Sequence, residues 1–350
     1  MVLQILAHSA KEHSMQKEIL SKVILLDNKG HLQTAGYAKQ FNFVYNKDNA
    51  KRRPFSLKEW DFYQVLCGSK VIQLTIGHVS YCSQVSASII DLETGQRRDV
   101  SSTKFLPKKL PKQMPTHPEK PHVLQYFRKN MHMQFSVEEK QRKLTFSCFD
   151  KLGLRAEIDL TFTNVGKNKE KMAIATPFAK SRQWYLNYKE NCFVVNGVCQ
   201  IDDMFVEVVD GNGLLDWGRG VWPRKHGWTW GNGSTVVDGK HFGFNIGWGF
   251  GNTANATENM FFYDNKAYKL GTVTKKVRKN GKIRYQDEEG KFVLDMTTTF
   301  DNFTETKAPF VHNTCHQVFG TWQGKVQLDE ETVLEIPPFV AFCEEANNKW

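Results

Sequence analysis

The chain has 350 residues, 40% of them apolar and 13% aromatic, which is enough to bury a large core and argues against a disordered protein. The formal net charge is +10. Its basic clusters, such as residues 275–284, are short, and no basic helix stripe, zinc-finger spacing or RNA-binding signature accompanies them, so we expect no nucleic-acid partner.

No apolar run approaches the ~20 residues that a membrane-spanning helix needs. The first six residues are too short an apolar stretch for a signal peptide and lack a basic flank. The seven cysteines form no C-x-x-C pair. Together these features predict a thiol-reduced, cytoplasmic protein without a membrane span.

Short stretches with period-two alternation dominate the chain. In residues 154–162, apolar side chains at even positions alternate with mostly polar ones, which predicts a half-buried strand. Residues 277–285 carry Asn280 and Gly281 at their centre and predict a β-hairpin. Residues 12–20 and 121–128 are the only candidates for short helices.

Residues 106–121 contain five prolines and four lysines, a composition that resists both a helix and a central strand. We interpret this segment as a linker or lid between an N-terminal β unit, residues 1–120, and a C-terminal unit, residues 121–350. Part of the N-terminal chain could complete the second unit. Short strands without alternating helices imply an all-β protein with antiparallel sheets or barrels.

Residues 216–259 differ in composition from the rest, with five of the nine tryptophans and ten glycines. Glycine beside tryptophan lets large rings crowd a cavity while the backbone approaches closely. An aromatic-lined cavity with a few polar groups is typical of a small-molecule site. An ordinary barrel core has the same composition, so both interpretations stay open.

Three ionisable residues are the catalytic candidates. Asp216 can act as a general acid or base, Arg219 can bind an oxygen, and His226 can transfer protons near neutral pH. The candidates for binding a substrate share the Trp- and Gly-rich stretch or the C-terminal run: Trp217, Trp222, Trp228, Trp230, Asn245, Trp248, Glu258, Asn259 and His316.

Familiar catalytic motifs are absent. The sequence has no G-x-S-x-G, no nucleotide-binding glycine loop between a strand and a helix, and no H-E-x-x-H. His312 and His316 have a four-residue spacing, but on an expected strand, so we expect no metal site and no cofactor.

Six ordered motifs resemble the bacterial family described as "domain of unknown function 2804". The resemblance runs from about Ile19 to the last residue. The motifs are KEWDFY at 58–63, DWGRGVW at 216–222, GFNIGWGFG at 243–251, ENMFFY at 258–263, HQVFG at 316–320 and NKW at 348–350.

A looser likeness links the Trp-Gly segment at 228–231 to the carotenoid 1,2-hydratases and the AttH-type, lipocalin-like proteins. This resemblance implies two packed lipocalin-like β-barrels or curved sheets with few helices. It also implies hydration, cyclisation or cycloaddition of greasy substrates. The chain departs from that group, because Lys225, His226 and Gly227 stand where it carries an Asp-His pair.

Our leading hypothesis is a cofactor-independent lyase, hydratase or isomerase acting on a small hydrophobic or polycyclic molecule. A carrier of a lipid-like molecule is the first alternative. Carbohydrate recognition is the second, since exposed tryptophans stack on sugars. The expected partner is a small hydrophobic ligand or substrate, and a homodimer stays open.

Overall fold

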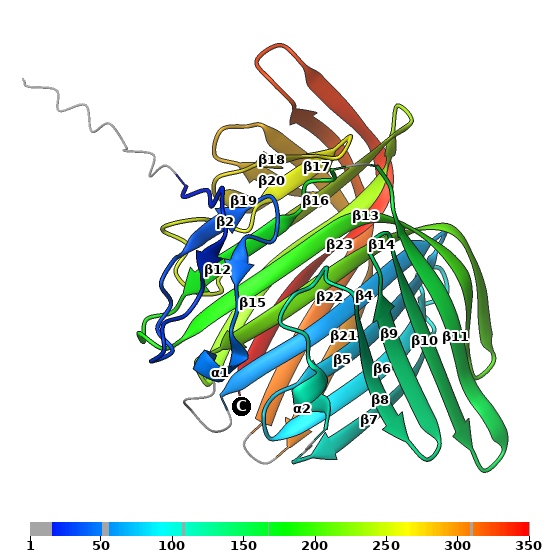
Figure 1. Ribbon diagram of the computed structural model, residues 1–350. Helices are drawn as coiled ribbons and strands as arrows, with labels where there is room; N and C mark the ends of the chain where they lie inside the picture. Colours follow the sequence, from blue (N-terminus) through cyan, green and yellow to red (C-terminus); the bar gives the residue numbers. More distant parts are fainter. Residues whose placement is uncertain (1–15, 51–55, 107–108, 167, 309–310, 350) are drawn as a thin grey trace, which may run out of the picture.

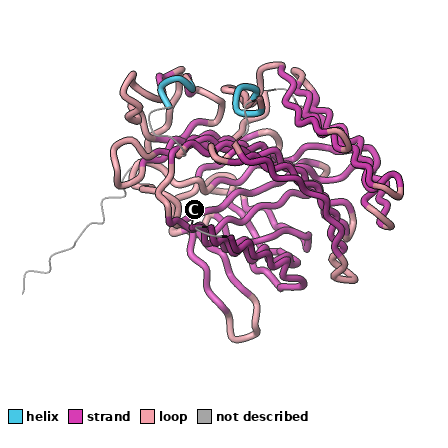
Figure 2. The backbone as a smooth tube through the Cα atoms, turned by 90° about the horizontal axis from the view of Figure 1, so that it is seen from below, coloured by secondary structure: helices cyan, strands magenta, loops and turns pink. Residues whose placement is uncertain are grey.

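The computed structural model describes residues 16–50, 56–106, 109–166, 168–308 and 311–349. These residues form two large antiparallel sheets, each curved into a half-barrel (Figure 1). They also form a parallel pair, β1 (Val23–Ile24) with β3 (Phe43–Val44), and two short helices, α1 (Lys47–Ala50) and α2 (Leu110–Gln113). Figure 2 shows the strands in curved layers with both helices at the periphery.

The first sheet has twelve strands among the described residues. Its central strand β13 pairs along one edge with β14 and along the other with β12 and β11 in turn. The order along the sheet is β7 (Arg97–Phe105), β6 (Cys82–Asp91), β5 (Lys70–His78), β4 (Leu57–Cys67), β14 (Met204–Val221), β13 (Trp184–Ile201), β11 (Gly153–Asn164), β10 (Gln141–Asp150), β9 (Met131–Val137) and β8 (His122–Arg128), with β12 (Met172–Pro177) and β2 (Gly36–Ala38) beside β13.

The second sheet has nine strands in the described part of the chain. The order is β18 (Lys266–Lys269), β17 (Met260–Tyr263), β16 (Lys240–Trp248), β15 (Lys225–Val237), β23 (Val333–Lys349), β22 (Val311–Gln327), β21 (Phe292–Ala308), β20 (Ile283–Asp287) and β19 (Val273–Val277).

The all-β prediction is confirmed. Strand β11 buries Ala156, Ile158, Leu160 and Phe162 on one face, as alternation predicted. The hairpin at 277–285 is also present, with Gly281 at a φ of 80° in its turn.

The helix predicted at 121–128 is wrong. The segment is strand β8, where Leu124 and Tyr126 alternate inward while Val123 and Phe127 are exposed. For the helix predicted at 12–20, residues 12–15 lie outside the described residues. Residues 16–20 are not helical, and Glu18 forms an isolated bridge with Tyr37.

The chain passes from the first sheet to the second at residues 222–224, between β14 and β15. The first sheet therefore takes strands from both sides of residue 120. The proline-rich segment lies against this sheet, because Arg219 Nε donates to Pro115 O at 3.1 Å and Arg142 Nη1 donates to Pro118 O at 2.8 Å.

Each sheet has two faces with different neighbours. We call the face that carries the sheet's own core its inner face: Tyr63 and Trp217 in the first sheet, Phe244 and Trp322 in the second. The opposite face of each sheet points toward the other sheet, and we call it the inter-sheet face. There, buried residues of both sheets form one hydrophobic cluster: Val71, Ile90, Leu214, Trp230, Phe319 and Phe342.

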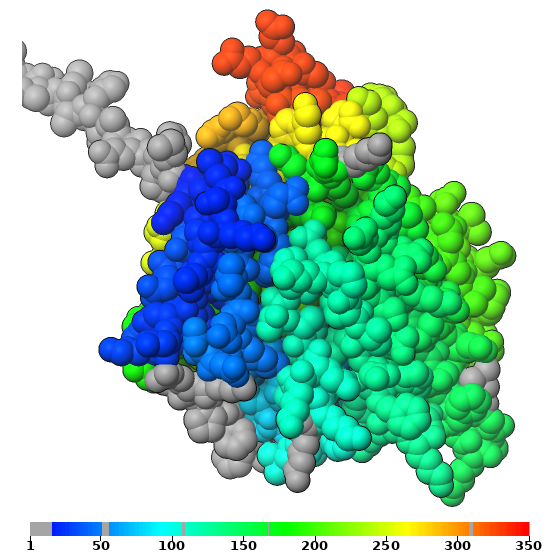
Figure 3. All heavy atoms as spheres, in the orientation of Figure 1, coloured from blue at the N-terminus to red at the C-terminus, as the bar shows by residue number. Residues whose placement is uncertain are grey.

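The N-terminal segment binds to both sheets. Strand β2 pairs with β12 of the first sheet. Toward the second sheet, Lys17 N donates to Asn255 O at 2.7 Å, and Gln16 Nε2 donates to Leu270 O at 2.8 Å. In Figure 3 this segment, in blue, lies beside the first sheet and below the yellow and orange strands of the second. It therefore fastens the two sheets together.

Candidate functional site

Asp216 stands at the centre of a polar cluster on the inter-sheet face of the first sheet. Its neighbours come from the two strands that flank β14. On β13, Lys189 pairs with Asp216 and Asn187 pairs with Gly218, and on β4, Trp60 also pairs with Gly218. Asn187 Nδ2 and Lys189 Nζ donate to Asp216 Oδ1 at 2.6 and 3.1 Å, and Trp60 Nε1 donates to Oδ2 at 3.0 Å. Three donors thus hold one carboxylate.

The second sheet completes this cluster from the opposite side. Lys189 Nζ lies 3.8 Å from Glu258 Oε2 and 3.8 Å from the centre of the Trp230 ring. Asn245 Nδ2 donates to the Glu258 carbonyl at 2.7 Å, and Trp230 Nε1 donates to Asn245 Oδ1 at 2.7 Å. One ammonium group is therefore shared by two carboxylates and an indole face.

A third carboxylate, Glu344 on β23, belongs to the same region. Trp228 Nε1 donates to Glu344 Oε1 at 2.7 Å, and Gln317 Nε2 donates to Oε2 at 3.5 Å. The charges of Lys189 and Asp216 both act on the pKa of Glu344. The cluster is therefore three carboxylates around one lysine.

Burial raises the pKa of both glutamates above the usual value. The negative charge of Asp216 raises it further, and the positive charge of Lys189 opposes the shift without cancelling it. Side-chain exposure is 16% for Glu258, 11% for Asp216 and 4% for Lys189. Both carboxyl groups thus keep some solvent exposure, whereas Lys189 is almost fully buried.

An aromatic group adjoins the carboxylates and consists of Trp60, Tyr185, Trp222, His226, Trp228 and Phe250. Trp60 and Trp222 meet edge to face at 4.7 Å, and His226 stacks on Trp228 at 5.9 Å. The group shares Trp60 and Trp228 with the cluster, since each donates its indole N–H to a carboxylate.

Glycine at position 218 makes the arrangement possible. A Cβ atom there would fall 2.1 Å from the Trp60 ring. Any other residue would displace Trp60 and break its hydrogen bond to Asp216.

The structure brings together five of the predicted residues: Asp216, Trp228, Trp230, Asn245 and Glu258. Two more, Trp222 and His226, join the aromatic group. His226 Nδ1 lies 2.9 Å from Pro223 O, and burial lowers the pKa of His226 to about 4. His226 is consequently neutral at physiological pH.

Arg219 lies away from this cluster, on the inner face of the first sheet. Its side chain is fully buried, pairs with Asp61 at 2.8 Å, donates to two strand carbonyls and to Pro115 O, and covers the Trp217 ring at 3.9 Å. Successive residues of a strand alternate between faces, so residues 216 and 219 point in opposite directions. Arg219 and Trp217 therefore support the fold from the inner side.

Three other predicted residues also lie elsewhere. Trp248 packs against the core of the second sheet. Asn259 accepts from Gly247 N at 2.7 Å and donates to Gly271 O at 2.8 Å. His316 is half exposed and pairs with Asp301 at 2.7 Å.

Four members of the polar cluster were not predicted: Lys189, Asn187, Trp60 and Glu344. Only Trp60 carried a signal, because it belongs to the motif KEWDFY. The other three lie in strands whose sequences resemble the rest of the sheet.

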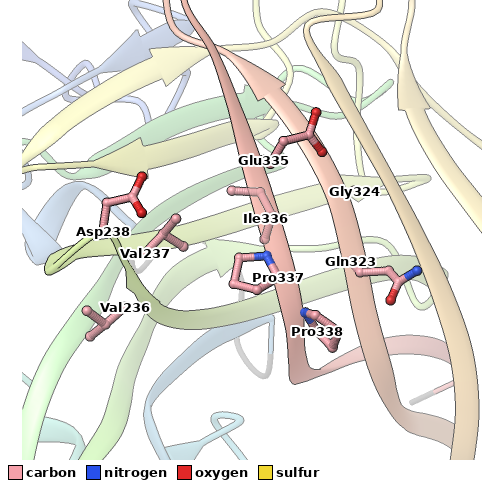
Figure 4. Close-up of a pocket in the computed structure, with 9 residues that line it drawn as sticks. All are labelled: Val236, Val237, Asp238, Gln323, Gly324, Glu335, Ile336, Pro337 and Pro338. Carbon is pink, nitrogen blue, oxygen red and sulfur yellow. The ribbon is translucent and has the colours of Figure 1, made fainter.

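Two cavities lie outside the cluster. One of about 530 Å³ opens where β15 and β23 separate, beyond their pairing from Lys225 to Asn232, and contains none of the predicted site residues (Figure 4). The other, of about 450 Å³, is lined by His226 together with Lys225, His312, Thr314, Asn347, Asn348 and Lys349. Within the described ranges, no three His, Cys, Asp or Glu residues are placed to hold a metal ion, and no helix is long and apolar enough to cross a membrane.

A family model with the description "Domain of unknown function (DUF2804)" matches residues 16–350. The chain belongs to this family. No curated protein matches the sequence. The predicted membership is therefore confirmed.

Solved structures similar to this DUF2804 member have low sequence identity to it. Kievitone hydratase from Nectria haematococca is 10% identical with a TM-score of 0.50, over 94% of this chain and 98% of that one. An AttH-type protein from Nitrosomonas europaea is 11% identical with a TM-score of 0.49, over 86% and 95%. CghA with Sch210972 is 8% identical with a TM-score of 0.45, over 93% and 97%. The likeness to kievitone hydratase shows that this chain has a similar fold.

Proposed function

We propose that this protein is a cofactor-independent lyase, hydratase or isomerase that acts on a small hydrophobic or polycyclic molecule between the two sheets. One observation carries the proposal: Asp216 on β14 and Glu258, in the loop before β17 of the other sheet, share the ammonium group of Lys189 beside the aromatic group. Burial raises the pKa of Glu258, so it suits the role of proton donor, and Asp216 suits the role of acceptor. The fold of kievitone hydratase supports the reaction class as an analogy.

In the hydration direction, Glu258 gives its proton to one carbon of a C=C bond. Water bonds to the other carbon and loses a proton to Asp216, so one water is added in total. Lys189, between the two carboxyl groups, then passes a proton to Glu258 and takes one from Asp216. Positioned acid and base groups typically accelerate such steps ~10²–10⁴-fold each.

Elimination of water reverses these steps. An isomerisation uses the same pair, with Asp216 removing a proton from one carbon and Glu258 delivering one to another. Glu344 is a second donor on the opposite flank. The aromatic group, which includes Trp222, Trp228 and His226, holds the substrate, while Arg219 keeps β14 in place from the inner face.

The test uses a panel of unsaturated ring compounds incubated with the protein in H₂¹⁸O and, separately, in D₂O. Mass spectrometry reads incorporated label. Wild type is expected to incorporate ¹⁸O or deuterium into at least one compound. Asp216→Asn and Glu258→Gln should each lower the rate by ~10²-fold or more, whereas Asp264→Asn, in an exposed ion pair, should not.

Unchanged labelling by Asp216→Asn would remove that residue from the reaction. Saturable binding of panel compounds without any label would support a carrier instead of an enzyme.

A further inference from the structure

The cavity of about 450 Å³ beside His226 lies where three neighbouring strands of the second sheet begin or end. Lys225 is the first residue of β15, His312 is the second residue of β22, and Lys349 is the last residue of β23. These three residues and His226 are basic, and none of the described residues that line the cavity is acidic. The charge of the lining is therefore of one sign.

The register of the sheet places basic residues in one row beside this cavity. Lys225 is directly opposite Lys349. Lys349 is opposite His312 on its other side, and His312 is opposite Lys307 of β21. Directly opposite residues of antiparallel strands share a face, and like charges in such positions destabilise a sheet. A bound anion would remove that cost.

The nearby carboxylates are engaged elsewhere. Glu305 lies 2.9 Å from Lys307 Nζ and 2.9 Å from His312 Nε2, so it compensates the far half of the row. Glu345 pairs with Lys275 at 2.5 Å. Lys225 and Lys349 form no ion pair with the other residues that the structure describes. The two opposing lysines thus lack a carboxylate of their own.

An amide donor of the lining adds to the lysines. Asn348 Nδ2 is buried and has no hydrogen-bond partner among the described residues. Asn313 Oδ1, on the opposite residue of β22, is also without a partner, but Asn313 does not line the cavity. A buried N–H without an acceptor costs free energy, which an oxygen in the cavity would offset.

His226 connects the cavity with the candidate site. It lines the cavity, and its ring stacks on Trp228 of the aromatic group at 5.9 Å. Trp228 in turn donates its indole N–H to Glu344. Lys225 and Trp228 are three residues apart, which is about 10 Å along an extended strand. A small polycyclic acid spans such a distance.

We propose that this cavity binds a carboxylate group of the substrate, which makes the substrate a small hydrophobic or polycyclic acid. The proposal rests on the proposed function for the place of the apolar body, which lies against the aromatic group. Lys225 and Lys349 donate charge-assisted hydrogen bonds to the carboxylate oxygens. The two lysines position the substrate and take no part in the proton transfers.

The experiment compares two probes that share a ring system and differ in charge. Equilibrium dialysis measures the affinity for 2-naphthoate and for its neutral isostere 2-naphthamide. The proteins are wild type, the double variant Lys225→Met/Lys349→Met and the control Lys325→Met. Lys325 is an exposed lysine near the other end of β22, so the control removes the same kind of charge far from the cavity.

Wild type is expected to bind 2-naphthoate more tightly than 2-naphthamide. The double variant should weaken 2-naphthoate binding about five- to tenfold, the combined effect of two exposed ion pairs, and should leave 2-naphthamide binding unchanged. Lys325→Met should bind both probes as wild type does. A second measurement requires no variant: added NaCl should weaken the binding of 2-naphthoate to wild type and spare that of 2-naphthamide.

Equal affinity of wild type for the two probes overturns the proposal, as does a wild type that binds neither. It also fails if the double variant keeps its 2-naphthoate affinity or loses affinity for both probes equally. Dialysis requires no turnover, so a protein that prefers 2-naphthoate but incorporates no label keeps the carboxylate site and loses only the proposed function. A protein that labels neutral compounds without preferring 2-naphthoate shows the reverse.

Discussion

Lys189 in the first sheet and Glu258, in the loop before β17 of the second sheet, face each other, with Nζ 3.8 Å from Oε2. The same ammonium group lies 3.1 Å from Asp216 Oδ1. The proton occupancy of Glu258 thus depends on how the two sheets are docked, because its nearest positive charge comes from the other sheet.

Lys189→Met should destabilise the protein by about 3–5 kcal/mol, since it leaves two buried carboxylates without their cation. Urea unfolding at neutral pH measures the change. The matched control is Lys240→Met, which removes a half-exposed pair with Asp264 and should change stability by about 1 kcal/mol or less. Similar losses in the two variants would contradict the central position of Lys189.

Glu258 and Glu344 should make the protein less stable as pH rises. Their pKa values are raised in the folded state, so the folded protein binds more protons than the unfolded chain. The stability that they contribute is complete below the unfolded pKa of about 4.3 and is lost as pH rises through the folded pKa. Glu258→Gln should therefore gain stability relative to wild type as pH rises above the unfolded pKa of about 4.3, measured by denaturant midpoints.

Asp91 should give stability the opposite pH dependence. Hydrogen bonds from Thr94 and Lys70 outweigh burial and lower the pKa of Asp91 to about 2. Its contribution is present above the unfolded pKa and is lost as pH falls toward 2. Wild type should lose its advantage over Asp91→Asn on acidification, and an advantage independent of pH would refute the assignment.

Gly218→Ala should destabilise the protein by about 1–3 kcal/mol, because its Cβ would overlap the Trp60 ring at 2.1 Å. Displacing Trp60 also frees one oxygen of Asp216, so label incorporation should fall. Gly77→Ala is the control, since Gly77 also pairs with Trp60 but the nearest atom to its added Cβ, Gln84 O, would be 3.8 Å away. Tryptophan fluorescence should change in the first variant only.

Arg219→Lys should cost about 1.5–3 kcal/mol or more, because lysine cannot reproduce bonds to Asp61, two strand carbonyls and Pro115 at once. Arg98→Lys, at an exposed pair with Asp203, should cost little. A loss of labelling by Arg219→Lys without a loss of stability would contradict a purely structural role and would indicate that Arg219 takes part in the reaction.

Much of the fold follows from local patterns. Alternation at 154–162 and the Asn280–Gly281 turn predicted a strand and a hairpin that the structure contains. The same alternation places Asp216 and Arg219 on opposite faces, so their separation was readable from their spacing. The short run 121–128 carried no cap or clear period, and it became a strand because β9 offered a partner edge.

The missing half of the site could not be predicted locally. The unusual composition of residues 216–259 identified Asp216 and Glu258 as candidates. Lys189 and Glu344 become part of the site only because the two sheets pack together. Their sequence neighbours are ordinary strand residues. Which face of a strand meets another sheet is decided by residues far away in the chain.

Strand β14 separates two different environments. The Asp216 side chain lies on its inter-sheet face and the Arg219 side chain on its inner face. One residue inserted between positions 216 and 219 would put both side chains on the same side of the strand, driving either a guanidinium among the tryptophans or a carboxylate into the core of the first sheet. Length variation within DWGRG should therefore be excluded by selection, while the tip of the hairpin at 278–282 is free to lengthen.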